Sequence, residues 1–426
     1  MDDPRVVILT FGCRVNQYES AMMESLLGSL RAVDRDDVDV FVLNACTVTG
    51  LAERKARQAA TRLRREHPRS RIVLIGCLAD AVEQRLTRFD TADLLAGNTW
   101  KPRIVELVER ARSGEHGLVP SIEPGPIADE TSAGERGRVR AHLKIQDGCA
   151  RACTYCRATQ VRGAPRSKPL DAVAAEAAAL VSSGHPEIVL SGIDLAQYAP
   201  PVGGLPDVVR RLLAIDGLSR LRIASINPSG LTASLVDAFA DDERACPHFH
   251  VPLQSGDDRI LRAMARGYTV SDYLGTIATV RERIPHATFG TDVIVGFPGE
   301  DETAFGETCR VIDDVGFVNL HAFRFSPRPG TVAADLRDGI TERVARCRAS
   351  AVARRWRDGL RRQLDNRLGS THHVLVEERR GDEWRGYTSD YLHVHFASRQ
   401  QIAIGSVRPV RIVAIAEDHL KGTIDA

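Results

Sequence analysis

A chain of 426 residues exceeds what one hydrophobic core usually serves, so we expect two or three domains. A net charge of +1 excludes a uniformly basic nucleic-acid binder, and no apolar run approaches the roughly 20 residues that a membrane-spanning helix needs. Met1 to Arg5 is acidic and leads into an apolar run rather than a signal peptide, so we expect a cytoplasmic protein without membrane contact.

Strands alternate with helices in the first segment. Amphipathic helical patterns cover Gln17–Ala32 and Leu51–Glu66, and three apolar, β-branched runs flank them: Val6–Leu9, Val40–Leu43 and Ile72–Ile75. This alternation predicts an α/β domain with a parallel sheet, which we assign to residues 1–120. The stretch Ser113–Arg136 is rich in Gly, Pro, Ser and Glu with little periodicity, which predicts a linker.

The middle segment, residues 138–365, repeats the alternation about six times. It predicts a full or partial (βα)6 barrel whose working residues lie at the carboxyl ends of the strands. Helical patterns separate the strands, for example Asp171–Ser182, Leu205–Ala214 and Val270–Arg283. The predicted strands are His142–Ile145, Glu187–Leu190, Arg220–Ala224, His248–Val251, Thr288–Ile294 and Asn319–Phe325.

After an arginine-rich helix the pattern changes to short strands with turns. Residues 366–426 contain five of them, which predicts a small antiparallel β-barrel of the oligonucleotide-binding type. These strands are Thr371–Glu377, Glu383–Thr388, Leu392–Phe396, Val407–Ala416 and Leu420–Ile424.

Three cysteines lie within eight residues after the first barrel strand. Cys149, Cys153 and Cys156 are spaced so that their thiols can surround one four-iron cubane, and three ligands leave one iron open for a chelating substrate. A zinc knuckle is the alternative, but it needs a fourth Cys or His nearby and none follows within the next 25 residues.

A second cysteine trio is dispersed along the chain. Cys13, Cys46 and Cys77 each follow an apolar strand by a few residues. Because the carboxyl ends of parallel strands meet at one edge of a sheet, these thiols could converge on a second cluster. Three buried core cysteines are the alternative. The remaining cysteines, at 246, 309 and 347, show no such pattern.

With both trios the chain resembles the methylthiotransferases, radical S-adenosylmethionine (SAM) enzymes, over essentially its whole length. The wording Cys13-Arg14-Val15-Asn16-Gln17 and Cys46-Thr47-Val48-Thr49 is most similar to the branch acting on threonylcarbamoyladenosine in tRNA. Other matching stretches are Gln146–Cys149, Val161–Gly163, Leu253–Asp258, Asp292–Glu300 and Phe325–Thr331.

The resemblance implies an N-terminal methylthiotransferase domain, a radical SAM core and a TRAM-like RNA-binding barrel. It implies SAM and two [4Fe-4S] clusters as cofactors, tRNA as partner, and an electron donor such as flavodoxin or ferredoxin. It further implies insertion of a methylthio group at carbon 2 of a modified adenosine next to the anticodon. We expect the enzyme to act as a monomer.

SAM contacts are expected at the ends of the barrel strands, where polar residues and glycines recur. Tyr155, next to the last cluster cysteine, could stack near adenine, and Ser225 or Asn227 could bind ribose hydroxyls. The full set of expected SAM-binding residues is Tyr155, Gly192, Asp194, Ser225, Asn227, Gln254, Ser255 and Val295.

Some residues depart from the family's pattern. After Cys156 the chain reads Arg157-Ala158-Thr159-Gln160, where relatives usually carry an aliphatic residue and a proline, and Asp194 stands where Asn or His is common. These departures leave room for a ribosomal-protein side chain or a small metabolite as substrate. A non-catalytic, metal-stabilised RNA-binding module is a third interpretation. For RNA we expect stacking by Trp384, Tyr387 and Tyr391, and phosphate contacts by Arg354, Arg355, Arg361, Arg362, Arg379, Arg380, Arg385 and Lys421.

Overall fold

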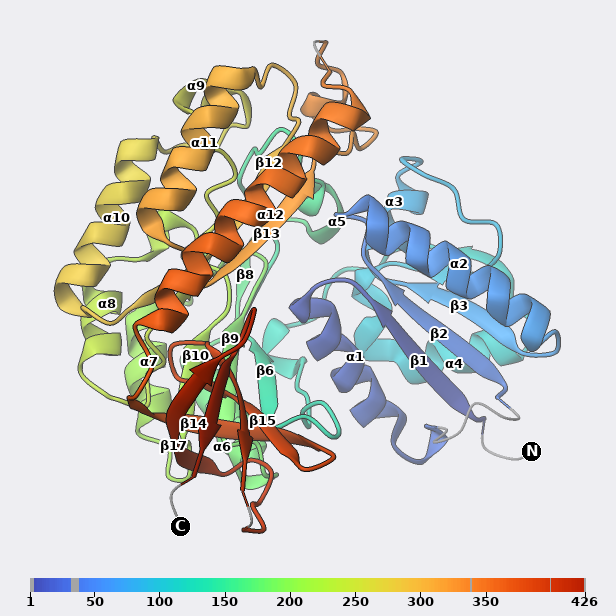
Figure 1. The fold of residues 1–426 in the computed structure, drawn as a ribbon. Coiled ribbons are helices and arrows are strands. Elements are labelled where there is room, and N and C mark those ends of the chain that lie inside the picture. Colours follow the sequence, from blue (N-terminus) through green and yellow to red (C-terminus); the bar gives the residue numbers. More distant parts are fainter. Residues whose placement is uncertain (1–3, 32–37, 338, 399, 425–426) are drawn as a thin grey trace.

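The computed structural model describes residues 4–31, 38–337, 339–398 and 400–424. Its first sheet is fully parallel and has the order β1-β2-β3-β4-β5 (Figure 1). Helices α1 (Arg14–Leu27) and α4 (Ile104–Arg112) cover one face, and α2 (Gly50–Glu66) and α3 (Cys77–Glu83) cover the other. The strands are β1 (Val6–Phe11), β2 (Val40–Ala45), β3 (Arg71–Ile75), β4 (Leu94–Ala96) and β5 (Gly117–Val119).

The predicted α/β architecture is confirmed, but two details were wrong. Strand β5 lies inside the segment 113–136 that we predicted to be a linker, because three residues suffice to pair with β4 at the edge of a sheet. Helix α1 begins at Arg14 rather than Gln17 and ends at Leu27, where Gly28 takes a left-handed φ of 54°. Ala32, the predicted end of that helix, lies outside the described residues.

The central barrel consists of two three-stranded parallel sheets, β10-β9-β6 and β11-β12-β13. A bridge between Ser225 and His250 joins them. The outer faces of the strands and the helices around them share one large core. The strands are β6 (Arg140–Lys144), β9 (Glu187–Ser191), β10 (Arg220–Ile223), β11 (His248–His250), β12 (Thr288–Val295) and β13 (Asn319–Arg324). The main helices are α6 (Leu170–Ser182), α7 (Leu205–Leu213), α8 (Ala233–Ala240), α10 (Val270–Arg283) and α11 (Glu302–Val315).

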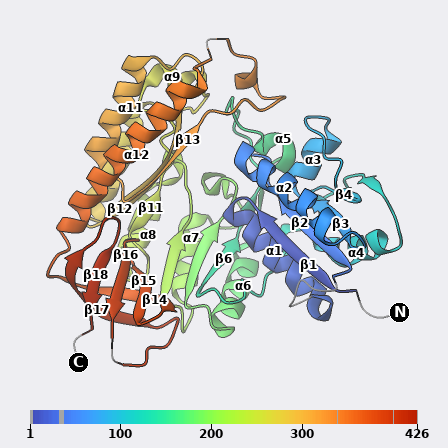
Figure 2. The same cartoon turned by 45° about the vertical axis from the view of Figure 1, so that its right-hand side comes forward.

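Helix α12 (Glu342–Asp365) leads from the central barrel to a closed C-terminal barrel of five strands (Figure 2). The ladders are antiparallel, as predicted, except that β16 and β18 pair in parallel. The strands are β14 (Thr371–Arg380), β15 (Glu383–Thr388), β16 (His393–Ala397), β17 (Val407–Ile415) and β18 (Leu420–Thr423). None of the described helices is long and apolar enough to cross a bilayer.

The C-terminal barrel closes the amino-terminal end of the central barrel. Arg220, the first residue of β10, donates hydrogen bonds to the carbonyls of Tyr387 (2.8 Å) and His373 (2.7 Å). The ring of Tyr391 stacks on His248 with centroids 4.7 Å apart. The open end of the central barrel is therefore the end that carries the cysteine loop.

Candidate functional site

The first cysteine trio lies along the carboxyl edge of the N-terminal sheet. Cys46 directly follows β2, Cys13 is the N-cap residue of α1 after β1, and Cys77 is the first residue of α3 after β3. Two glycines make the close approach possible. A Cβ at Gly12 would lie 2.5 Å from the Cβ of Cys46, and a Cβ at Gly76, whose φ is 97°, would lie 2.9 Å from Asn44 Oδ1.

The three sulfur atoms converge as predicted from the topology. The thiol of Cys46 lies within hydrogen-bonding reach of both Cys13 and Cys77. Its hydrogen bonds lower the pKa of Cys13 to about 7 and that of Cys77 to about 5, and the positive charge of Arg162 acts in the same direction. Two of the three sulfurs are thus prepared to be thiolates, which is the form that binds iron.

Arg162 ties this trio to the central barrel. Its Nε donates to Cys77 Sγ at 3.0 Å, and its Nη2 donates to Glu19 Oε2 at 3.0 Å. Glu19 of α1 also pairs with Lys101 and Lys144, and the side chains of all four residues are at most 2% exposed. This buried ionic network joins α1 to the barrel strand β6.

The second trio lies in the loop between β7 (Gln146–Asp147) and α5 (Ala158–Arg162). Each sulfur has a hydrogen-bond donor: Gln197 Nε2 lies 3.2 Å from Cys149 Sγ, Arg266 Nη1 lies 3.3 Å from Cys153 Sγ, and the Ala158 amide lies 3.3 Å from Cys156 Sγ. Burial raises the pKa of Cys156 to about 11, so this thiol keeps its proton at neutral pH unless a metal ion displaces it.

Helix α5 connects the two trios. It lies beside α3 in both views (Figures 1 and 2), and Val161 packs directly against Cys77. Arg157, the residue after Cys156, is 1% exposed and donates to Thr47 Oγ1 (3.0 Å), next to Cys46. Arg157, which departs from the family's pattern, therefore links the two cysteine loops by a direct hydrogen bond.

Four of the expected SAM-binding residues gather at the mouth of the barrel. Asp194 is buried and accepts hydrogen bonds from Asn227 Nδ2 (2.8 Å) and Gln197 Nε2 (2.6 Å), and Arg151 pairs with it. Tyr155 lies 3.3 Å from Arg266 Nη1. At Gly192, a Cβ would lie 2.9 Å from Leu195 Cδ2 and 3.0 Å from Gln146 Cβ, so a larger residue there would have to displace these side chains.

The other four expected residues differ in what they offer. Ser225 is exposed at the end of β10. Gln254 has a left-handed φ of 65°, and its buried Oε1 has no hydrogen-bond partner among the described residues, which suits an oriented ligand contact. Ser255 instead faces Thr308 of α11, and the side chain of Val295 lies in the core between strands and helices. The structure does not bring these last two side chains to the barrel mouth.

Sequence reasoning missed two residues of this site. Arg266 joins Cys153, Tyr155 and Asn227, and Gln197 joins Cys149 to Asp194. Arg266 lies far from the cysteines in sequence, in the turn after α9 (Asp258–Ala263), so no local spacing pointed to it. Gln197 lies three residues after Asp194 and could have been found as part of the same strand-end turn.

The two trios fit iron–sulfur clusters better than single zinc ions. Within the described ranges, the one group of Cys, His, Asp or Glu whose ligand atoms all lie within 4.8 Å is His250, Asp292 and His321 rather than either trio. Three thiols with nitrogen donors at their sulfurs match the ligand set of a cubane in which three of the four irons are held by protein. These residues would hold the clusters.

The predicted aromatic stacking platform on the C-terminal barrel was wrong. Trp384 is 4% exposed and belongs to the core of that barrel. Tyr387 and Tyr391 stack on each other at 5.1 Å and on the guanidinium of Arg140, so they fill the junction between the barrels. These three rings are occupied by packing inside the protein, so they are not available to stack on RNA bases.

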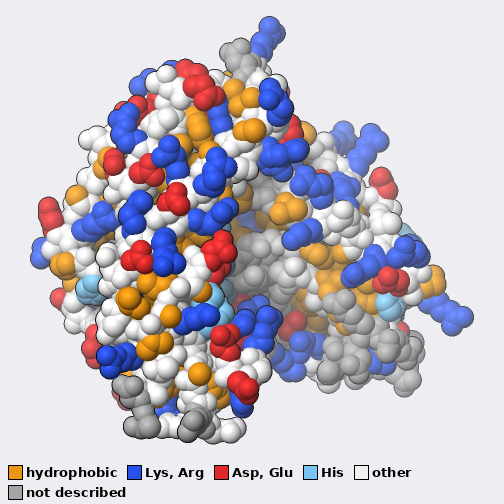
Figure 3. Space-filling view, viewed as in Figure 1, with side chains coloured by type: hydrophobic (Ala, Val, Ile, Leu, Met, Phe, Trp, Pro, Cys, Tyr) orange, Lys and Arg blue, Asp and Glu red, His pale blue; other side chains and the backbone are white. Residues whose placement is uncertain are grey.

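Basic side chains are nevertheless exposed. Figure 3 shows Lys and Arg spread over the face that α12 crosses, beside a hollow between the N-terminal domain and the rest of the molecule. Arg355 and Arg361 pair with Asp313 and Asp365, whereas Arg354 and Arg357 are exposed without a hydrogen bond or ion pair to any described residue. These free guanidinium groups suit RNA phosphates.

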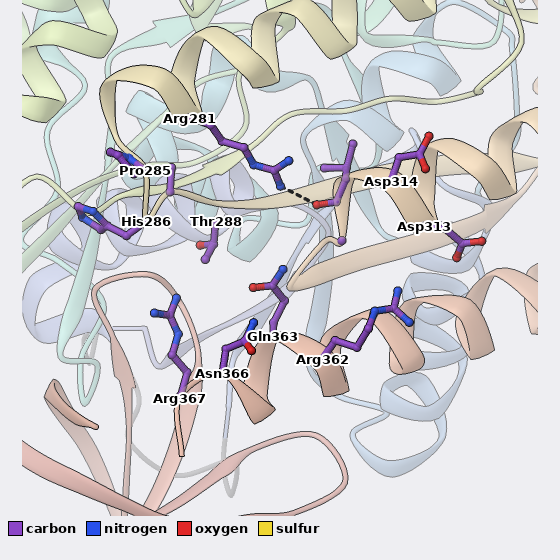
Figure 4. Close-up of a pocket in the computed structure, with 14 residues that line it drawn as sticks. Arg281, Pro285, His286, Thr288, Asp313, Asp314, Arg362, Gln363, Asn366 and Arg367 are labelled. Atoms are coloured by element: carbon purple, nitrogen blue, oxygen red, sulfur yellow. Dashed lines mark hydrogen bonds between the residues drawn. The ribbon is translucent and has the colours of Figure 1, made fainter. Parts of the chain in front are cut away.

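A pocket of about 630 Å³ lies at the end of the central barrel opposite the cysteine loops (Figure 4). Arg281, Arg362 and Arg367 line it, and Arg281 donates to the Val315 carbonyl. Asp313 and Asp314 also line it, and none of its described lining residues is a cysteine.

Comparisons with known proteins agree with this geometry. Residues 143–312 match the Radical SAM superfamily, and residues 5–97 match Uncharacterized protein family UPF0004. The chain is 33% identical to the threonylcarbamoyladenosine tRNA methylthiotransferase of Chlamydia pneumoniae, covering 98% of this chain and 97% of that protein. It is 36% identical to the tRNA-2-methylthio-N(6)-dimethylallyladenosine synthase of Anaeromyxobacter sp. strain K, covering 99% and 94%.

A solved structure shares the fold. The radical SAM methyltransferase TsrM from Kitasatospora setae matches with a TM-score of 0.56 at 15% identity, covering 78% of this chain and 75% of that one. At this identity the match supports the arrangement of the α/β domain and barrel alone.

Proposed function

The chain belongs to the radical SAM tRNA methylthiotransferases, and from this premise we propose that it methylthiolates carbon 2 of threonylcarbamoyladenosine beside the anticodon of tRNA. As a member of that family it is an enzyme that uses SAM and two [4Fe-4S] clusters. This sets aside a non-catalytic RNA-binding module. Sequence identity does not tell which modified adenosine is the substrate, since relatives from both the threonylcarbamoyl and the dimethylallyl branches are between 31% and 36% identical to this chain.

Arg14 supports the choice of a substrate that carries a carboxylate. It follows Cys13 at the start of α1, and its charge acts on His142 and His248 of the central barrel, on Tyr391 at the junction of the two barrels, and on Glu135. It is half-buried and forms no hydrogen bond or ion pair with any residue in the described ranges. A threonylcarbamoyl group carries a free carboxylate, whereas a dimethylallyl group is a hydrocarbon. A cation without a partner beside the sulfur-donor trio therefore favours the carboxylate-bearing substrate.

The chain's own residues position the reactants. Cys149, Cys153 and Cys156 would hold the cluster that supplies the electron for SAM cleavage, and Cys13, Cys46 and Cys77 the cluster that supplies sulfur. Asp194 and Asn227 form a polar floor for SAM beside Arg266. Arg157 and Arg162 fix one cysteine loop against the other, so that the target base is held between them. An external donor such as flavodoxin or ferredoxin, and a monomeric state, are part of this proposal.

Nucleoside profiling of tRNA tests the proposal. We expect tRNA from cells lacking this protein to lose 2-methylthio-threonylcarbamoyladenosine and to keep the 2-methylthio derivative of dimethylallyladenosine. The reverse pattern would assign the chain to the other branch. Unchanged tRNA, together with methylthiolation of a ribosomal protein, would instead show that a ribosomal-protein side chain is the substrate.

A further inference from the structure

A second polar cluster lies in the wall of the central barrel. His250 of β11, Asp292 of β12 and His321 of β13, which we call the Asp292 cluster, sit on neighbouring strands. Asp292 Oδ1 lies 3.1 Å from His250 Nε2 and 3.0 Å from His321 Nδ1, so one carboxylate oxygen accepts from both rings. None of these groups contacts either cysteine trio, and the chemistry described above does not use them.

The Asp292 cluster faces the interior of the barrel. Phe289 and Val293 of β12 pack into the core shared with the outer helices, so Asp292 between them points to the opposite side. Ile294, the next residue on that inner side, packs with Tyr155 of the cysteine loop. Two residues of strand span about 7 Å, so the Asp292 cluster lies one step below the loop that carries Cys156.

The space in front of the cluster is open and lined by rings. The side chain of His321 is 52% exposed and that of Asp292 is 25% exposed. Phe323, on the same side of β13, is 41% exposed, and its ring centroid lies 6.1 Å from that of His321. An exposed phenylalanine inside a barrel offers a stacking surface for a planar ligand.

We propose that the Asp292 cluster and Phe323 form the subsite for the target adenine, with the base stacked on Phe323 and His321 and its N6–H donated to Asp292. This inference rests on the proposed function, since it assumes a modified adenosine of tRNA. An N6-substituted adenine keeps one hydrogen on N6, and an ionised carboxylate only accepts. The two histidines fix the carboxylate by occupying Oδ1, which leaves Oδ2 for the base.

Binding of anticodon stem-loops tests the subsite. Fluorescence anisotropy under anaerobic conditions would compare the cluster-loaded enzyme with Asp292→Asn and Phe323→Ala on RNA containing threonylcarbamoyladenosine. We expect Phe323→Ala to bind about 5- to 150-fold more weakly, because stacking on one aromatic ring contributes about 1–3 kcal/mol per base. Asp292→Asn should also bind more weakly, because it replaces the carboxylate that accepts the N6–H by a neutral amide. RNA-independent SAM cleavage should be unchanged. Asp171→Asn on α6, where the carboxylate is exposed, is the matched control and should bind within twofold of wild type.

A stem-loop with an abasic site at the target position completes the test. Wild type should bind it at least as weakly as either variant binds the intact loop, and wild type and both variants should bind the abasic loop with equal affinity. Equal binding of the intact loop by wild type and both variants, with methylthiolation by wild type intact, would refute the subsite alone. Failure of wild type to methylthiolate this loop would instead refute the proposed function. One equivalent of zinc or manganese bound by wild type and lost in Asp292→Asn would overturn the subsite in favour of a metal site.

Discussion

Replacing Arg157 by methionine should uncouple the two halves of the reaction. The guanidinium donates to Thr47 Oγ1 at 3.0 Å and twice to the Pro329 carbonyl, at 2.8 and 3.1 Å. Hydrogen bonds to charged groups contribute about 1.5–3 kcal/mol each, but removing a buried cation beside Arg328 offsets part of that loss, so we expect unfolding to become easier by about 2 kcal/mol. The fold survives, while the loop after Cys46 loses its bond to the loop of Cys156.

Since a misplacement of about 1 Å can lower a rate by about 100-fold, we expect product formed per SAM cleaved to fall at least 10-fold in this variant. Deoxyadenosine and methylthio-nucleoside would be quantified together by mass spectrometry. Arg262→Met, on the exposed face of α9, is the matched control. Thr47→Val removes only the hydroxyl acceptor, and a double-mutant cycle with Arg157→Met should show coupling. Additive effects, or an unchanged ratio of product to cleaved SAM, would refute the positioning role.

Three further predictions follow from other parts of the structure. Alanine at Cys13, Cys46 and Cys77 should spare deoxyadenosine formation and stop sulfur insertion, whereas alanine at Cys149, Cys153 and Cys156 should stop both; product formation by the first variant would contradict the assigned roles. Burial holds the pKa of His248 well below its usual value, so its contribution to stability is complete above the unfolded pKa of about 6.5 and is lost as pH falls below it, by about 1.4 kcal/mol per pH unit. Denaturant titrations at pH 7 and 5 should show this loss, and it should be smaller in His248→Gln. Arg354→Ala and Arg357→Ala should each reduce the slope of log affinity for tRNA against log salt by about one; a slope equal to that of wild type would exclude phosphate contact by α12.

Topology alone located the dispersed cysteine trio. Cys13, Cys46 and Cys77 have no motif spacing, yet the apolar run before each predicted a parallel strand, and parallel strands end at one edge. The same reasoning placed Asp194 and Asn227 together. These successes depend on backbone periodicity, which the sequence shows directly.

The failures depend on side-chain direction and on long-range packing. Ser255 follows its strand as Gln254 does, but one residue turns the side chain from the barrel mouth to Thr308 on α11. Tyr391 has the composition of an RNA-stacking residue, yet its ring fills the junction with β11. Arg266 is brought to Cys153 by a turn more than a hundred residues away, and no local pattern reports such a contact.

The junction between the N-terminal domain and the central barrel explains why charged groups are buried beside the cysteines. Glu19 accepts from Arg162 while Lys101 and Lys144 pair with it, and an apolar interface of the same volume would be at least as stable, because desolvating ions costs much of what their attraction contributes. An apolar interface, however, could slide. The charged interface cannot slide in this way, since the same Arg162 guanidinium that donates to Glu19 also donates to Cys77 Sγ. The buried charges therefore fix where one sulfur trio stands relative to the other. A reaction in which one cluster supplies an electron and the other supplies sulfur to the same base depends on that position more than on stability.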